Sequence, residues 1–390
     1  MELAPEDCER CRDLTKRLLD KTLQDCQALG LEATCDHANL DKKRWKKLQS
    51  HTDVTIYADR SANSAWLPVM RRDEWECPVA VTALGRMECS LDDLLLALMT
   101  PNTASQRLRS FLMDRRPEKN CQLAPIVTPT QESPFHFLAA SRFVNTQNWP
   151  FTMFKSPREM VLTFGTGEIT SPNGKRCGYE VVQSISLRNH SRHASMPRSQ
   201  ALQARLFWGQ PDGSIAVYNK LVVDAKSRLS DSVKQLTLCR AVLGFWKLVP
   251  RSLETKKLWW CVKNKTTLMH NLVRSHSQSE AAEESAGCAV KRPHTVANQC
   301  EFCETRLCGG SKCRTSCQLK MVLSSDNGFL EQTLTLCLRC AAFVRSRNAA
   351  DIARAQLLEM HQSSFGSASS FTKMSTREED TFSSASTEST

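Results

Sequence analysis

Seven cysteines lie within the forty-one residues from Cys300 to Cys340, and their spacing constrains this part of the chain more than any other feature. The cluster begins with one Cys-x2-Cys pair and ends with another, with three single cysteines between them. Such a pair places two thiolates on one tight turn, where both can bind the same tetrahedral ion at about 2.3 Å. We therefore predict a metal-binding module. Its candidate ligands are Cys300, Cys303, Cys308, Cys313, Cys317, Cys337 and Cys340.

The N-terminal sequence helps to decide between metal ligation and disulfide bonds. Residues 1–8 carry acidic side chains where a secretory signal needs a basic start, and the longest apolar run, residues 94–99, is too short to span a membrane. In a reducing compartment, clustered cysteines favour zinc over disulfides. We expect a cytoplasmic protein, with a peripheral position at endosomal or other internal membranes as an alternative. The remaining cysteines are expected to be small buried apolar residues.

The net charge of +11 favours anionic partners, although the basic residues are spread thinly. Two basic runs, residues 42–47 and 256–265, lack the regular alternation with aromatic residues that a nucleic-acid-binding strip needs. We interpret each run as the solvated face of a helix, and we expect no nucleic-acid partner. The same charge suits anionic lipid head groups as well.

Short β-prone segments follow one another between about residues 121 and 225, with turn residues and no helical pattern between them. This succession predicts an antiparallel, curved sheet. Two β-prone segments, 54–57 and 79–89, precede it. The later segments are 135–144, 160–165, 179–187, 204–208 and 214–223.

Helical patterns precede and follow these strands. Residues 9–30 have an amphipathic pattern, Ser90 is placed to cap a helix over 91–99, and residues 104–114 suggest another short helix. After the sheet, Ser232 and Gln235 fit a capping box at the start of a long helix that Pro250 is expected to close. The predicted fold class is therefore α+β.

The order of elements from about residue 50 to 250 resembles a START-type lipid-binding domain, which has a helix-grip fold. The most similar segment is residues 81–93, VTALGRMECSLDD, in which a strand enters a helix capped at Ser-x-Asp-Asp. Segments 317–323 and 336–340 look like the closing half of a FYVE-type zinc module. Together they resemble the START/FYVE proteins abundant in oomycetes. The resemblance implies a curved antiparallel sheet around the last helix, with an elongated apolar cavity between them.

A FYVE-type finger binds two zinc ions in cross-brace order, so the resemblance implies that the first and third cysteine pairs share one ion. The second ion would then lack one thiolate, which His294, His361 or water could replace. The alternative is that the second site does not exist, and we expect a single firmly bound zinc ion. Carried over, the first set is Cys300, Cys303, Cys313 and Cys317, and the second is Cys308, Cys337 and Cys340.

The motifs with which this family reads phosphoinositides are absent. No WxxD precedes Cys300, the basic RxHHCR strip is reduced to residues 306–310, RLCGG, and TLC at 335–337 replaces the closing RVC. We expect weak or no binding of phosphatidylinositol 3-phosphate. Contact with a protein, or a weak contact with a membrane, is the role that these residues favour for the finger.

A lipid cavity needs apolar and aromatic walls with few polar groups. The alternative is that the same side chains fill an ordinary core, in which case the chain is a protein adaptor. The candidate wall residues are Phe137, Phe143, Phe164, Trp208, Val242 and Trp246.

A third hypothesis is a hydrolase on the same fold. His136, His190 and His193 are the histidines nearest the predicted sheet, and the last two lie close to Ser195 in the sequence. No Gly-x-Ser-x-Gly motif accompanies them, so we expect a protein that is not an enzyme.

The patterns divide the chain into six segments. They are an N-terminal helical segment (1–50), a START-like domain (51–250), a linker (251–298), a FYVE-like finger (299–345), a short helix (346–361) and a disordered Ser/Thr-rich tail (362–390).

Overall fold

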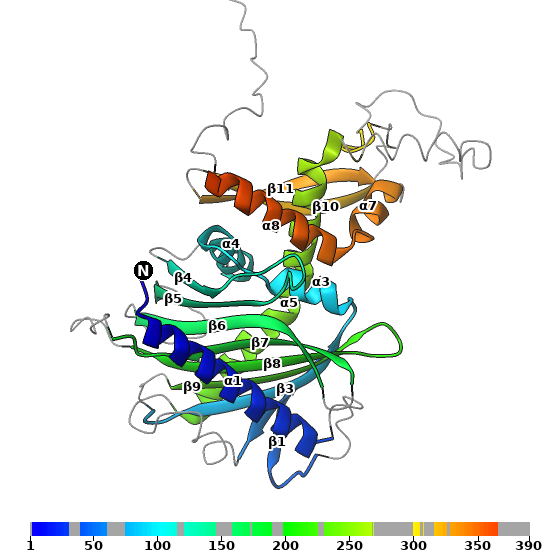
Figure 1. The fold of residues 1–390 in the computed structure, drawn as a ribbon. Coiled ribbons are helices and arrows are strands. Elements are labelled where there is room, and N and C mark those ends of the chain that lie inside the picture. Colours follow the sequence, from blue (N-terminus) through cyan, green and yellow to red (C-terminus); the bar gives the residue numbers. More distant parts are fainter. Residues whose placement is uncertain are drawn as a thin grey trace, which may run out of the picture.

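The computed structural model describes residues 2–30, 40–60, 75–114, 121–145, 158–171, 174–188, 198–224, 230–266, 268, 299–304, 307, 316–325 and 328–365. They form two modules, a large curved sheet with helices and a smaller hairpin with helices (Figure 1). The predicted α+β class is confirmed.

The large sheet has nine strands in the order β1-β2-β3-β9-β8-β7-β6-β5-β4, and every neighbouring pair is antiparallel. All seven predicted strands are present. The basic run 42–47, interpreted above as a helix face, instead enters β1, and β4 was not predicted. The strands are β1 (Trp45–Ser50), β2 (Val54–Asp59), β3 (Val79–Met87), β4 (Gln122–Val127), β5 (Phe137–Asn145), β6 (Arg158–Thr170), β7 (Arg176–Ser184), β8 (Gln200–Gly209) and β9 (Ile215–Asp224).

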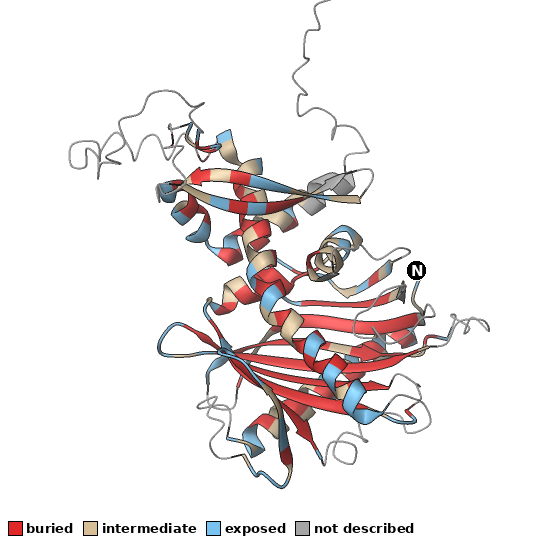
Figure 2. Cartoon of the chain, turned by 180° about the vertical axis from the view of Figure 1, so that it is seen from behind, coloured by how far each residue is buried: buried red, intermediate tan, exposed pale blue. Residues whose placement is uncertain are grey.

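Helices cover both faces of this sheet, and most of its strand residues are buried (Figure 2). On the outer face lies α1 (Pro5–Ala28), whose Leu18 packs with Leu206. On the inner face lies α5 (Asp231–Lys263), whose Val242 packs with Leu221. The arrangement of a curved sheet around one long helix, which the resemblance implies, is therefore present.

Two short helices connect β3 to β4. The first, α3 (Leu91–Leu98), begins at Ser90, whose Oγ accepts a hydrogen bond from the Asp93 backbone N–H at 3.1 Å, as predicted. The second is α4 (Thr103–Asp114). A Cβ atom at Gly178 of β7 would lie 2.8 Å from Leu91 Cδ1, so the absence of a side chain there allows α3 to pack closely on the sheet.

The prediction that Pro250 closes the last helix is wrong, because α5 continues to Lys263. A proline inside a helix lacks one backbone N–H donor, which destabilises the helix. Burial on both sides of Pro250 offsets this cost: Phe245 stacks on Phe207 of the large sheet, and Leu258 lies in the core of the small module. Residues 251–263 are therefore no linker, and Lys256 and Lys257, expected on a solvated face, are buried.

The small module contains a hairpin of β10 (Ser316–Ser325) and β11 (Gly328–Cys337), followed by α7 (Leu338–Arg345). Its core includes Leu258 of α5 together with Phe302 and Leu336. The final helix, α8 (Ala349–Phe365), packs its Ile352 against α3. Among the helices that the structure describes, none has the length and apolar character needed to cross a membrane.

Candidate functional site

Four cysteines of the small module converge on one point. Their sulfur atoms all lie within 4.8 Å of one another, and the Cys303 and Cys337 sulfurs are 3.7 Å apart. Four thiolates at about 2.3 Å from a tetrahedral ion lie about 3.8 Å apart, so the observed spacing suits such an ion. The four residues are Cys300, Cys303, Cys337 and Cys340.

Local backbone structure positions these thiols. Cys300 precedes a tight turn closed by the Glu304 N–H, which donates to the Cys300 carbonyl at 2.8 Å, and Glu304 has a positive φ of 60°. The second pair begins at Cys337, which ends β11 and caps α7. Backbone N–H groups donate to two of the sulfurs: Cys337 N to Cys300 Sγ at 3.3 Å and Cys340 N to Cys337 Sγ at 3.4 Å. Such donors stabilise negative charge on sulfur.

The donor set indicates the kind of ion. Burial raises the pKa of both Cys337 and Cys340. The neighbouring thiols raise the pKa of Cys340 further, whereas hydrogen bonds with Cys340 partly lower that of Cys337. A divalent cation reverses this balance, and binding it releases the thiol protons. Four sulfur ligands in a closed tetrahedral arrangement are typical of structural zinc. The residues present therefore fit a zinc ion.

The structure groups the cysteine pairs differently from the cross-brace pairing. Cys300 and Cys303 share their site with the last pair, Cys337 and Cys340, and not with Cys317. The physical reason is the hairpin, which returns the chain from the first pair to the last. The Cys317 sulfur instead accepts a hydrogen bond from Arg345 at 3.5 Å. Cys308, Cys313 and His294 lie outside the described residues, as does the side chain of His361.

A second cluster of interest lies on the inner face of the large sheet. Thr166, Glu180, Arg205 and Asn219 are successive cross-strand neighbours on β6, β7, β8 and β9, so their side chains form one polar row. We call these four residues the inner polar row. Phe245 of α5 covers it, with the Arg205 guanidinium carbon 4.1 Å from the centre of the Phe245 ring.

Glu180 is the electrostatic centre of this row. Arg205 donates a hydrogen bond to one of its oxygens, and Arg109 of α4 lies 2.6 Å from the other. Burial by itself raises the pKa of the Glu180 carboxyl, but the two guanidinium groups outweigh it and hold that pKa below its usual value. The Glu180 carboxylate and the two guanidinium groups together carry one net positive charge, and this charge lies at a site with little access to water.

Two donor atoms of the row are buried and have no hydrogen-bond partner among the described residues. They are Arg205 Nε and Asn219 Nδ2, although the Asn219 side-chain oxygen accepts from Gln203 at 3.2 Å. Unpaired buried donors are rare because each costs about 1–3 kcal/mol. The row therefore has free capacity for an acceptor oxygen.

The six predicted wall residues do not line one space. Phe137 and Phe164 contact each other on the inner face, with ring centres 5.6 Å apart, and Phe143 and Val242 share a neighbouring cluster. Trp208 lies on the opposite, outer face beside α1, because the strand alternation turns Phe207 rather than Trp208 toward α5. The sixth residue, Trp246, is half-buried against the cluster of Phe143 and Val242, and it also lines a groove.

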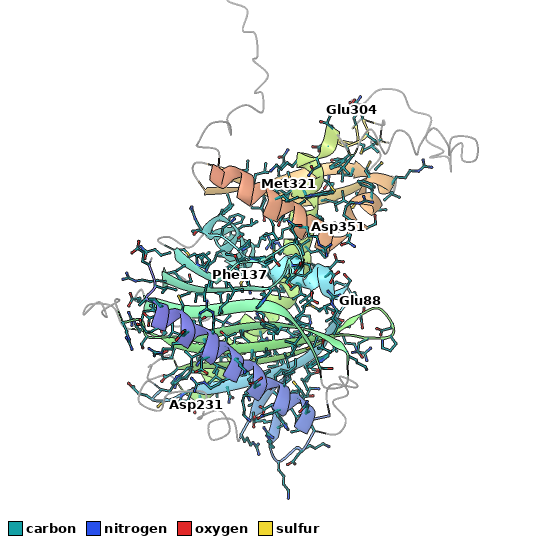
Figure 3. All side chains as sticks on the ribbon, viewed as in Figure 1. Glu88, Phe137, Asp231, Glu304, Met321 and Asp351 are labelled. Carbon is teal, nitrogen blue, oxygen red and sulfur yellow. The ribbon has the colours of Figure 1, made fainter. Side chains whose placement is uncertain are left out.

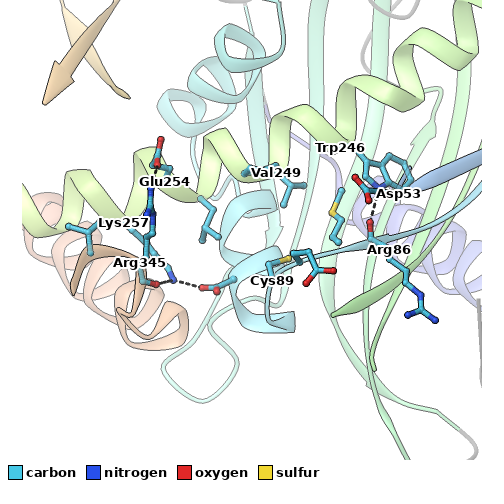
Figure 4. A pocket seen from close by; sticks show the side chains of 14 residues that line it. Asp53, Arg86, Cys89, Trp246, Val249, Glu254, Lys257 and Arg345 are labelled. Atoms are coloured by element: carbon cyan, nitrogen blue, oxygen red, sulfur yellow. Dashed lines mark hydrogen bonds and ion pairs between the residues drawn. The ribbon is translucent and has the colours of Figure 1, made fainter. Parts of the chain in front are cut away.

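This groove has a volume of about 500 Å³ and lies where α5 passes from one module to the other (Figure 4). Trp246, Leu253 and Arg345 of α7 are among the residues that line it. Lys257 crosses it with two bonds, one to Asp93 Oδ1 at 2.6 Å and one to the Arg345 carbonyl at 2.8 Å. The groove thus contains a direct connection between α3 and α7.

Sequence reasoning missed Glu180, Arg205, Asn219 and Arg109. A signal was present, because Glu180 and Arg205 are charged residues inside two largely apolar segments predicted to be strands. Of the histidines considered for catalysis, His136 is exposed just before β5, and His190 and His193 lie outside the described residues together with Ser195.

No family model and no curated protein matches this chain. Among solved structures, it is similar to human StAR-related lipid transfer protein 5, with 10% identity over 63% of this chain and 97% of that chain and a TM-score of 0.42. A STAR-related lipid transfer protein from Xanthomonas axonopodis shares 13% identity over 54% of this chain and 98% of its own, with a TM-score of 0.35. These identities and TM-scores are low.

Proposed function

We propose that the large module is a START-like domain that binds a ligand with an apolar body and an oxygen acceptor. The acceptor binds at the inner polar row, and the apolar body lies between the sheet and α5. The observation that carries this proposal is the pair of buried donors, Arg205 Nε and Asn219 Nδ2, that have no partner in the described part of the chain. A hydroxyl, carbonyl or acid oxygen of a lipid supplies the missing acceptor.

The surroundings of the row support an amphiphilic ligand. Phe137, Phe164 and Phe245 bring apolar surface to the inner face on either side of the polar groups. Few polar groups in an apolar setting are typical of small-molecule sites. We do not assign catalysis to this row, because an arginine, an amide and an ion-paired carboxylate offer no activated nucleophile.

The four-cysteine centre has a structural role in this proposal. It binds one zinc ion and stabilises the small module, whose surface serves protein or membrane contact. The incomplete second zinc site, the cytoplasmic location and weak or no binding of phosphatidylinositol 3-phosphate stay predictions from the sequence.

Native mass spectrometry of the full chain, purified from a lipid-rich lysate, tests both parts of the proposal. We expect a bound mass of one zinc ion and a further mass from a co-purified lipid. Arg205→Met should reduce lipid affinity by about tenfold or more, because a hydrogen bond to a charged group contributes about 1.5–3 kcal/mol.

Lys220→Met is the matched control. Lys220 is as fully buried as Arg205 and lies on the adjacent strand, but it pairs with Asp59 on the outer face of the sheet. This variant should lose stability and keep its lipid. If the wild-type protein carried no lipid, or if both variants lost it equally, the adaptor hypothesis would be preferred.

A further inference from the structure

Helix α4 is held from two sides. Toward the sheet, its Arg109 lies 2.6 Å from Glu180 of the inner polar row. Away from the sheet, α4 faces the hairpin of the small module, and Figure 1 shows it between β5 and the β10–β11 pair. Movement of the hairpin away from α4 therefore removes one set of the contacts that position Arg109 over the row. Other contacts come from the large module: the Gln106 amide donates to Ser141 Oγ at 3.1 Å, and Arg109 donates to the Leu98 carbonyl at 3.3 Å.

The contact between α4 and the hairpin is specific. The rings of Phe111 and Phe329 have centres 5.2 Å apart, and Val322 of β10 is buried against Leu112 of α4. Arg251 of α5 joins the same two elements. One of its guanidinium nitrogens donates to the Leu112 carbonyl at 2.7 Å and another to Glu331 of β11 at 2.7 Å.

The metal centre lies at the opposite end of the same hairpin. Pairing between β10 and β11 is continuous from Ser316 opposite Cys337, beside the four cysteines, to Ser325 opposite Gly328, near α4. Figure 3 shows Met321 in the small module above the large sheet that carries Phe137. The hairpin is thus a rigid connection between the centre and α4.

The hairpin depends on the metal for its position. An isolated two-stranded hairpin is only marginally stable in water. Here Cys300 and Cys340 are both buried in the core that contains Leu336 of β11, so the residues that bind the ion are also part of the core that orders the strand. Small modules of this size generally need a metal or disulfides to fold.

We infer that metal binding at the four cysteines controls access to the inner polar row, by ordering the hairpin that holds α4 against the sheet. This inference rests on the proposed ligand site. With zinc bound, Arg109 stays on Glu180 and a bound ligand exchanges slowly. Without zinc, the hairpin loosens, α4 separates from it, and the row opens at the α4 side.

Hydrogen exchange measured by mass spectrometry on the full chain tests the structural step without any ligand. We compare the zinc-loaded protein with the same protein after chelation, and with a Cys337→Ser, Cys340→Ser double variant. Amide exchange in residues 103–113 should increase about tenfold, while β8, in the middle of the sheet, stays protected. Unchanged exchange in α4 after complete zinc removal would overturn the inference.

A second variant keeps the zinc and removes only the contact. Phe329→Ala should leave the zinc content at one ion per chain and still accelerate exchange in α4. Leu330→Ala is its control on the same strand, because Leu330 is 61% exposed. This pair decides the question even if chelation unfolds the whole chain. Normal α4 protection in zinc-loaded Phe329→Ala would contradict the role of the hairpin.

The effect on ligand release is measured separately. If a lipid co-purifies, its release rate from Phe329→Ala should exceed that from wild type, with Leu330→Ala unchanged. If α4 exchange changes but no lipid is found, the link between zinc binding and α4 holds and the proposed function is rejected. A lipid whose release rate is the same in all three proteins would reject the control of access and retain the proposed function.

Discussion

At the scale of single residues, the pH dependence of stability should identify Glu180 as a buried carboxylate. Its two guanidinium partners hold its pKa below the usual value of 4.5, so its favourable contribution is present at neutral pH and is lost as the pH falls through its pKa in the folded state. Glu180→Gln leaves the buried Arg205 and the half-buried Arg109 without a counter-charge and should cost about 3–5 kcal/mol at pH 7. The difference in unfolding free energy from wild type should decrease only below pH 4.5.

Urea unfolding at a series of pH values measures this difference. Glu168→Gln provides the control, because Glu168 pairs with Arg176 at an exposed position where an ion pair contributes about 1 kcal/mol or less. A Glu180→Gln variant that unfolded like the control at every pH would show that Glu180 is not a buried ion-paired carboxylate.

The sequence predicted residue types better than residue partners. The two Cys-x2-Cys pairs identified thiols suited to a metal, because the spacing within a pair is local. Which two cysteine pairs share an ion depends on the path of the hairpin between them. That path is set by contacts between residues far apart in the sequence. Trp208 failed for a related reason: strand residues alternate between faces, so an error of one residue places a side chain on the wrong side of the sheet.

At the scale of elements, α5 belongs to both modules, and the burial of its second half can be tested against an exposed position on its first half. Leu258, in the second half, is fully buried in the core of the small module, whereas Leu236, in the first half, is 44% exposed. Leu258→Ala should therefore lower the free energy of unfolding by about 2–5 kcal/mol. Leu236→Ala should change it by about 0.5 kcal/mol or less. Chemical denaturation of both variants measures this, and equal effects would show that the second half of α5 does not pack into the small module.

The path of α5 also shows why its end could not be predicted from the local sequence. Pro250 is a sound reason to end a helix, since proline removes a donor and disturbs the preceding turn. The helix continues because tertiary burial is stronger than this local preference. Beyond Pro250, Lys256 is buried and donates to the carbonyls of Leu96 and Met99 at 2.6 Å each, at the end of α3. Nothing in the local sequence distinguishes such a lysine from one on a solvated helix face.

At the scale of the whole molecule, the two modules share too many elements to unfold independently. One helix, α5, supplies core residues to both, and α8 returns from the small module to pack Ile352 and Ala353 against α3. The Arg354 guanidinium and backbone carbonyl also exchange hydrogen bonds with Gln131 of the large module, at 3.0 and 3.1 Å. A break in the small module therefore exposes apolar surface of the large one.

We accordingly expect the zinc-loaded chain to unfold in one calorimetric transition. Anything that binds only the folded state stabilises it, so added chelator should lower the midpoint of that transition. Two well-separated transitions in the loaded protein would mean that the modules are independent. In that case α5 would have to fray near Pro250 while its first half stayed on the sheet. The connection from the metal centre through the hairpin to α4 requires the opposite, because a small module that unfolds alone cannot hold Arg109 on Glu180.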